Sequence, residues 1–357
     1  MRCFVPQHDK TKYMKERILS LDLARGFTVM FIAPVHTMLL FSKPSVQETW
    51  LGWIFRFVSE GPGAQLFMLL MGVSFALSEK KSSRLVLKRA FVILAVGYFL
   101  NVLKFGLPIL FGLMPDELMK WLEVPNNSYG FVQLVFTGDI LQLAGLSLIV
   151  LLICNRIFKY RFLYFVFAIL ICFVSPLLWD IKTGSVVFDY LLQLAGGQPP
   201  RVFFPLFPWL AYTVFGVYVG SMIKSGMKFQ LPKLWVGSFM IGIIYVIVHY
   251  FIHFDNADSF YRTGLVGTIM HLLIVMVWIY AWHLLSKWLP LNKVFELLCW
   301  LSKHITLIYF VQWVFIFWLL PVFGFQMFGF YASVWLMALV TFNVWGIVYI
   351  VDKMRCS

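Results

Sequence analysis

The chain has 357 residues, of which 61% are hydrophobic and only 13% are charged, whereas about a quarter of the residues in an average soluble domain are charged. Apolar runs of about twenty residues recur along it, and a water-soluble fold of this size cannot bury so many. The composition therefore excludes a soluble protein. It predicts an all-α integral membrane protein, a polytopic bundle of about ten transmembrane helices in one domain over residues 1–357, with a basic segment at 1–17.

Apolar runs bounded by charged residues or by Pro and Gly predict the spans in chain order. They lie near residues 19–41, 62–78, 89–111, 132–154, 162–179, 202–223, 234–252, 264–285, 304–323 and 327–351.

The basic residues indicate topology. The formal net charge is +13, and most of the 29 Lys and Arg residues fall in alternate loops, on the side that also carries both ends of the chain. The positive-inside rule then predicts cytoplasmic termini in a bacterial-type inner (plasma) membrane, with membrane lipids but no nucleic acid as partners. The five cysteines show no CxxC pair and no metal-ligand spacing, so neither a disulfide scaffold nor a metal site is expected.

The first predicted span carries three ionisable residues, Asp22, Arg25 and His36. Each such residue costs about 2.5–3.5 kcal/mol inside a membrane, so each is a functional candidate. Eleven helical steps return to within about 20° of the starting direction while rising about 16 Å, which puts Arg25 and His36 on one face. His36 could serve as a general base or as an acyl-accepting nucleophile. Alternatively, Asp22 and Arg25 form an ion pair at the helix end, and His36 only bonds a neighbouring helix.

The stretch RILSLDLARGFTVMFIAPVH resembles the opening of the acyltransferase-3 superfamily of integral membrane acyltransferases. The hallmark of that superfamily is an Arg, ten residues and a His, after a Leu-Asp-x-x-Arg-Gly signature, and Arg25 and His36 match it. Later segments look more like the related heparan-alpha-glucosaminide N-acetyltransferase branch. They are GAQLFMLLMGVSFALS, GDILQLAGLSLIV, FFPLFPWLAYTVFGVYVG and LSKHITLIYFVQ, at residues 63–78, 138–150, 203–220 and 301–312.

The resemblance implies a membrane-bound, acyl-CoA-dependent acyltransferase. It would move an acyl group, usually acetyl, from cytoplasmic acetyl-CoA as co-substrate to a hydroxyl or amine of an extracytoplasmic saccharide or lipid-linked glycan. Many members of the glucosaminide branch carry Asn at the position of His36 and a catalytic His in the following loop, whereas this chain has no His between residues 37 and 248. Whether oxygen or nitrogen is acylated, and whether His36 carries the acyl group or acts as the base, stay open.

The remaining candidates surround this proposed chemistry. Arg25, with Asp22 beside it, is the expected inner contact to the donor. The densest basic cluster is expected to hold the donor phosphates, although topology alone explains each of its members equally well. That cluster is Lys80, Lys81, Arg84, Lys88 and Arg89. The expected acceptor-lining residues are Asp139, Gln142, Arg201, Trp209 and His271.

The main alternative function is a proton-coupled secondary transporter or a lipid-linked sugar flippase. In it, Asp22, Arg25, His36 and Asp139 would couple protons or bind substrate. The paired broken helices in two related halves that favour a transporter are not found in the sequence. Composition leaves open the acceptor, the acyl-chain length and whether the chain forms a homodimer.

Overall fold

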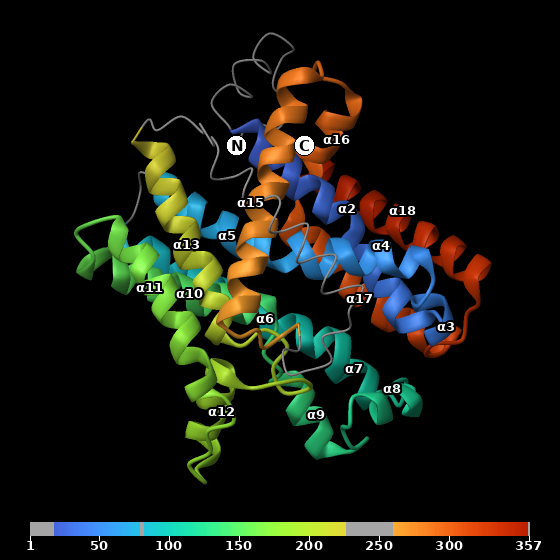
Figure 1. The fold of residues 1–357 in the computed structure, drawn as a ribbon. Helices are drawn as coiled ribbons and strands as arrows, with labels where there is room; N and C mark the ends of the chain where they lie inside the picture. The colour runs from blue at the N-terminus through green and yellow to red at the C-terminus, as the bar shows by residue number, and fades with distance from the viewer. Residues whose placement is uncertain (1–17, 79–81, 226–259, 356–357) are drawn as a thin grey trace. The chain divides into compact units, whose positions relative to one another are not determined.

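The computed structural model describes residues 18–78, 82–225 and 260–355, and the regular secondary structure in these ranges is helical throughout (Figure 1). Eight of the described helical segments are long and apolar enough to cross a membrane. They are Leu19–Phe41, Trp50–Leu77, Ser83–Leu110, Ile140–Ile157, Leu206–Lys224, Leu265–Trp288, Ile305–Phe323 and Phe330–Met354. The expected all-α polytopic membrane fold is thereby confirmed.

Chain contacts divide the molecule into two compact units. The first contains the described parts of Met1–Gly63, Leu110–Leu118 and Trp278–Ser357, and the second contains those of Ala64–Ile109 and Met119–Val277. The prediction of a single domain and that of cytoplasmic termini stay predictions.

Helix α2 (Leu19–Phe41) is the centre of the first unit and contacts α4 (Trp50–Val58), α16 (Lys293–Lys303), α17 (Ile305–Phe323) and α18 (Phe330–Met354). In Figure 1, α2 is the blue helix beside the red α18. Gly26 allows α16 to approach α2 closely, since a Cβ there would overlap the Leu298 carbonyl group. The short helix α3 (Pro44–Gln47) follows α2.

In the second unit, α5 (Ala64–Leu77) and α13 (Leu206–Lys224) form the most extensive helix pair. Gly72 lies against the Thr213 carbonyl and Gly216 against the Leu69 carbonyl, so neither position has room for a Cβ. Small residues at helix crossings are typical of membrane bundles, where close packing supplies much of the association energy. This pair forms the scaffold around which the rest of the unit is built.

The other helices of the second unit pack against that pair or against one another. Helix α6 packs along α10, and α11 packs along α13. The helices within this unit are α6 Ser83–Asn101, α9 Ser128–Val135, α10 Ile140–Ile157, α11 Phe162–Val174 and α12 Val186–Gly196. Three helices are divided between the two units: α7 Leu107–Leu110, α8 Asp116–Trp121 and α15 Leu265–Trp288. Shorter turns are the π-helical η1 (Ser59–Gly63) and η2 (Val102–Gly106) and the 3-10 helix η3 (Ser175–Leu178).

Three predicted spans differ from the observed helices. The span expected from residue 62 begins at Trp50, because η1 carries the helix through Ser59–Gly63 instead of ending it. The span expected over 132–154 is divided, because α9 ends at Val135 and Asp139 caps a new helix at Ile140. The span near 162–179 corresponds to Phe162–Leu178, which is shorter than the eight spanning segments. The span at 234–252 lies outside the described residues.

The segments at residues 112–131 and 180–201 contain short helices, and a buried arginine anchors the second of them. Arg262 donates to the carbonyl oxygens of Gly196 and Gly197 at the end of α12, and to both carboxylate oxygens of Asp180 at 2.9 Å. Since Arg262 is 8% exposed, these acceptors replace the water that it loses on burial. The hydrogen bonds from Arg262 hold the pKa of Asp180 below its usual value.

Candidate functional site

The first turns of α2 carry a closed polar group built from Asp22, Arg25 and Ser302. Arg25 Nη2 donates to Asp22 Oδ1 at 2.7 Å, and Arg25 Nε donates to Ser302 Oγ at 2.7 Å. Ser302 Oγ in turn donates to the same Asp22 oxygen at 2.8 Å. Asp22 and Ser302 are buried, and the Arg25 side chain is 21% exposed. The Asp22–Arg25 ion pair of the alternative interpretation is therefore present, and it orients a partly accessible guanidinium group.

His36, further along α2, is half-buried and contacts α17. The Gln312 amide nitrogen lies 2.9 Å from His36 Nδ1. The Trp313 ring stacks on the imidazole with a centroid distance of 4.1 Å and an interplanar angle of 30°. These two contacts hold the imidazole in one orientation, as a general base or nucleophile requires.

The opposing segment holds residues that sequence reasoning missed. Ser302 and Gln312 lie ten residues apart, close to the eleven that separate Arg25 from His36, so the two segments meet at two matching levels. Both residues fall in LSKHITLIYFVQ, which had been noted only for its family resemblance. The two residues lie on different helices, α16 and α17, and no local signal in the sequence marks them as facing the first span.

Glu60 is a third residue that sequence reasoning missed. It lies in η1, inside the membrane-length segment Trp50–Leu77 rather than at its edge, and η1 contacts α2. Single π-helical turns are rare and recur at functional sites. The sequence prediction started this span at residue 62, after Glu60, because charged residues were expected to bound the apolar runs.

In the second unit, Asp139 and Gln142 lie at the start of α10. Asp139 Oδ1 accepts from the Ile140 backbone nitrogen at 2.8 Å, and the Gln142 side-chain oxygen accepts from the Asp139 backbone nitrogen at 3.1 Å. Lys104, 2% exposed, donates to Asp139 Oδ2 at 2.7 Å. Asp139 and Gln142 thus form a capping box, and Lys104 is the buried counter-ion of Asp139. Their role in lining an acceptor site stays a prediction.

Trp209 and His271 also lie in the second unit, each with a hydrogen-bond partner. Trp209, 1% exposed, donates from Nε1 to the Tyr261 carbonyl at 2.8 Å. His271 Nδ1 lies 3.2 Å from the Tyr212 hydroxyl. Arg201 is exposed, and its carbonyl accepts from the Gly138 backbone nitrogen at 3.0 Å. Their predicted acceptor-lining role stays untested.

The predicted phosphate-binding cluster is only partly within the described residues. Arg84, Lys88 and Arg89 lie exposed in the first half of α6, and Lys80 and Lys81 fall outside the described ranges. Within the described residues, no group of three or more His, Cys, Asp or Glu side chains is arranged to hold a metal ion.

Comparison with known proteins identifies the family. Residues 17–253, about two thirds of the chain, match the family model described as heparan-alpha-glucosaminide N-acetyltransferase, catalytic. No curated protein and no solved structure matches the chain. The matched region begins at the Arg17 that opens the first-span motif and includes both Arg25 and His36. The chain therefore belongs to the family of heparan-alpha-glucosaminide N-acetyltransferase catalytic domains and is a multi-pass membrane acetyltransferase that acts on a glycan.

Proposed function

We propose that the protein transfers an acetyl group from cytoplasmic acetyl-CoA to a hydroxyl or amine of an extracytoplasmic saccharide or lipid-linked glycan, with His36 at the reacting centre. The observation that carries this proposal is the environment of His36. An imidazole inside a membrane helix is oriented by an amide at 2.9 Å and by a stacked indole. A histidine that served only to anchor the helix would not need both constraints.

The Gln312 amide suits either role of the imidazole. Its side-chain oxygen has no hydrogen-bond partner among the described residues. Rotation of the amide by 180° exchanges its oxygen and nitrogen at His36 Nδ1. With the oxygen there, Nδ1–H donates to Gln312, and Nε2 carries the lone pair that a base or nucleophile uses. Gln312 is therefore a positioning residue in this proposal.

Two balanced reactions use that lone pair. As a base, His36 accepts the proton of the acceptor hydroxyl or amine while this group attacks the thioester carbonyl; the C–S bond breaks, and the proton passes to the CoA sulfur. As an acyl carrier, His36 Nε2 attacks the thioester carbonyl, the C–S bond breaks, and the Nδ1 proton passes to the CoA sulfur; the acceptor then attacks the acetyl-imidazole, the N–C bond breaks, and the acceptor proton returns to the imidazole. Both reactions need a site that excludes water, because hydrolysis would compete.

Arg25 is the proposed donor contact on α2. Its guanidinium group is held by Asp22 and Ser302, yet remains partly accessible. A fixed guanidinium group can bind a donor phosphate without first losing side-chain entropy. Asp22 and Ser302 then act through Arg25. Arg84, Lys88 and Arg89, with Lys80 and Lys81, are the proposed outer contacts to the donor phosphates.

We propose Asp139, Gln142, Arg201, Trp209 and His271 as the residues that line the acceptor site. The Tyr212–His271 contact supports a polar role for His271, because the hydroxyl gives the ring a fixed partner. The transfer assay with a saccharide pool identifies the acceptor.

The test measures acetyl transfer by the purified full chain in detergent, with labelled acetyl-CoA and a mixed saccharide pool. Wild-type protein and the matched control His283→Ala should release CoA when saccharide is added. His36→Ala should lose about 10²–10⁴-fold in rate. Gln312→Leu should lose about tenfold in kcat with little change in the KM for acetyl-CoA, since one orienting hydrogen bond disappears.

Two outcomes would contradict the proposal. Wild-type turnover by His36→Ala would remove His36 from the reacting centre. Failure of the wild-type chain to bind acetyl-CoA at all would remove the donor, and proton-coupled transport would become the function to assay.

A further inference from the structure

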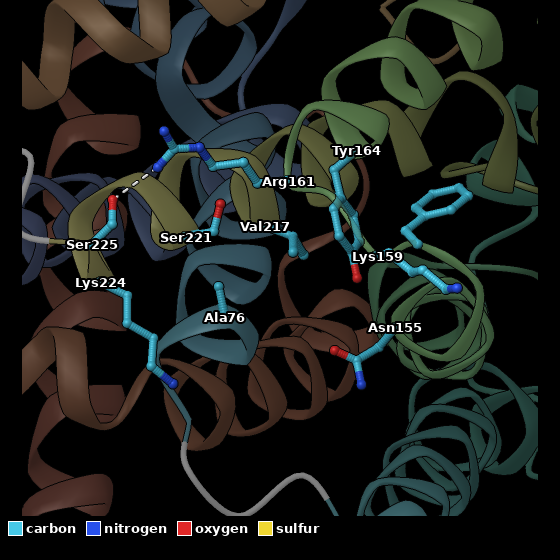
Figure 2. A pocket seen from close by; sticks show the side chains of 10 residues that line it. Ala76, Asn155, Lys159, Arg161, Tyr164, Val217, Ser221, Lys224 and Ser225 are labelled. Atoms are coloured by element: carbon cyan, nitrogen blue, oxygen red, sulfur yellow. Dashed lines mark hydrogen bonds between the residues drawn. The ribbon is translucent and has the colours of Figure 1, made fainter.

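The second unit contains a pocket of about 320 Å³ where the ends of four helices meet. The C-terminal ends of α5, α10 and α13 and the N-terminal end of α11 supply its lining, which includes Ala76, Asn155, Tyr164 and Ser221 (Figure 2). Its volume falls at the lower end of the range for small-molecule sites, about 300–1,000 Å³. It is therefore far larger than a single ion requires.

Three cations surround this pocket. Lys159 and Arg161 come from the connection between α10 and α11, and Lys224 comes from the last turn of α13. None of the described lining residues is acidic. Positive charges held around one concavity without a carboxylate among them repel one another, and an anion between them relieves that repulsion.

Neutral hydrogen-bonding groups complete the lining. Arg161 Nη1 donates to Ser225 Oγ at 2.9 Å, which fixes the guanidinium group against the end of α13. Figure 2 shows the Tyr164 hydroxyl pointing toward the space beside the Asn155 amide and Lys159. Hydroxyl and amide hydrogens and fixed cations together are the groups that bind phosphate oxygens.

Topology alone accounts for the charges but not for their arrangement. The positive-inside rule predicts Lys and Arg anywhere in these cytoplasmic segments. It does not require them to share a pocket with Tyr164, which is only 6% exposed, and with the apolar wall formed by Ala76 and Val217. A pocket that combines an apolar wall with convergent polar groups is typical of a small-molecule site.

We propose that this pocket, bounded by Lys159, Arg161, Lys224 and Tyr164, binds the phosphate groups of an organic phosphate. Two molecules present at this membrane surface carry that chemistry: the adenosine bisphosphate part of CoA and the headgroup of an acidic phospholipid. The first source rests on the proposed function, and the second does not. Arg156 donates to Ser83 Oγ at 3.0 Å and so joins the end of α10 to the start of α6. The start of α6 also carries Arg84.

The test compares wild-type full-length protein with the double variant Lys159→Gln/Lys224→Gln. The matched control, Lys287→Gln/Lys293→Gln, removes the same charge from residues in the first unit. The soluble probe is adenosine 3′,5′-bisphosphate, with binding measured by titration calorimetry in detergent. The lipid probe is phosphatidylglycerol in nanodiscs, with retained lipid counted by native mass spectrometry.

The pocket variant should weaken its ligand by roughly tenfold for each lysine removed, and the control should not. Binding should also weaken as ionic strength rises. Loss confined to the nucleotide assigns the pocket to the donor, and loss confined to the lipid assigns it to a phospholipid. If neither probe distinguishes the pocket variant from the control, the proposal is overturned.

These readouts need no turnover. His36→Ala should bind both probes like wild type, so an inactive enzyme with intact phosphate binding would contradict the proposed function alone. Conversely, an active enzyme whose pocket variant binds both probes normally would overturn only the phosphate site.

Discussion

Gly26 links the packing of the first unit to its polar site, and Gly26→Ala tests that link. The new Cβ would lie 2.6 Å from the Leu298 carbonyl carbon and 2.9 Å from its Cα. Carbon atoms in contact stand about 3.5 Å apart, and the Leu298 carbonyl oxygen would overlap the new Cβ more severely still, so α16 must move from α2 by more than about 0.9 Å. The two bonds to Ser302, 2.7 and 2.8 Å long, then exceed hydrogen-bonding distance.

Overpacking costs about 1–3 kcal/mol, and each lost bond to a charged group adds about 1.5 kcal/mol. We therefore expect Gly26→Ala to lower the free energy of unfolding by about 4–6 kcal/mol and to melt on the order of 5 °C lower in detergent. If Ser302 orients Arg25 for the donor, acetyl transfer by the folded fraction should also fall, by up to about 100-fold.

Gly346→Ala is the matched control for this measurement. Gly346 lies on an exposed position of α18 in the same unit, and nothing stands within 4 Å of a Cβ there. It should melt slightly higher, because Ala is favoured over Gly in helices by about 0.5–1 kcal/mol. If Gly26→Ala melts and turns over like the control, the close approach of α16 does not hold the polar group together, and this reasoning is refuted.

Lys104→Met should lower the free energy of unfolding by about 3–5 kcal/mol, because it leaves Asp139 buried without its cation. Adding Asp139→Asn should restore most of this loss, because Asn still caps α10. A double variant no more stable in a melting assay than Lys104→Met would contradict the buried pair. The lowered pKa of Asp180 stabilises the α12 segment above the ordinary pKa of about 3.9, and this contribution disappears as pH falls through the lowered value. Because Asp180 is 63% exposed, its contribution is at most about 1 kcal/mol. The protection of this segment from a protease should therefore fall in acid. It should fall less in Asp180→Asn than in wild type, and equal acid sensitivity of the two proteins would contradict the stabilising role of Asp180.

Much of the fold follows from local pattern. Most observed spanning helices agree with the predicted ones, because a run of apolar side chains must form a hydrogen-bonded helix in lipid whatever lies beside it. The errors occurred where polar groups decide whether a helix continues. The Gly-Pro-Gly after Glu60 stays helical through a π turn, whereas the segment before Asp139 breaks.

For the candidate site, the sequence by itself determined one helix: Asp22, Arg25 and His36, their spacing along α2 and their resemblance to a family of membrane acyltransferases. Only the tertiary structure decided their partners. Ser302 and Gln312 lie about 280 residues away in the chain, and nothing local indicates which residue of a late apolar helix will face the first. Helical periodicity fixes the face on which a residue lies, but the facing residue depends on how closely two helices approach, and here Gly26 permits that approach.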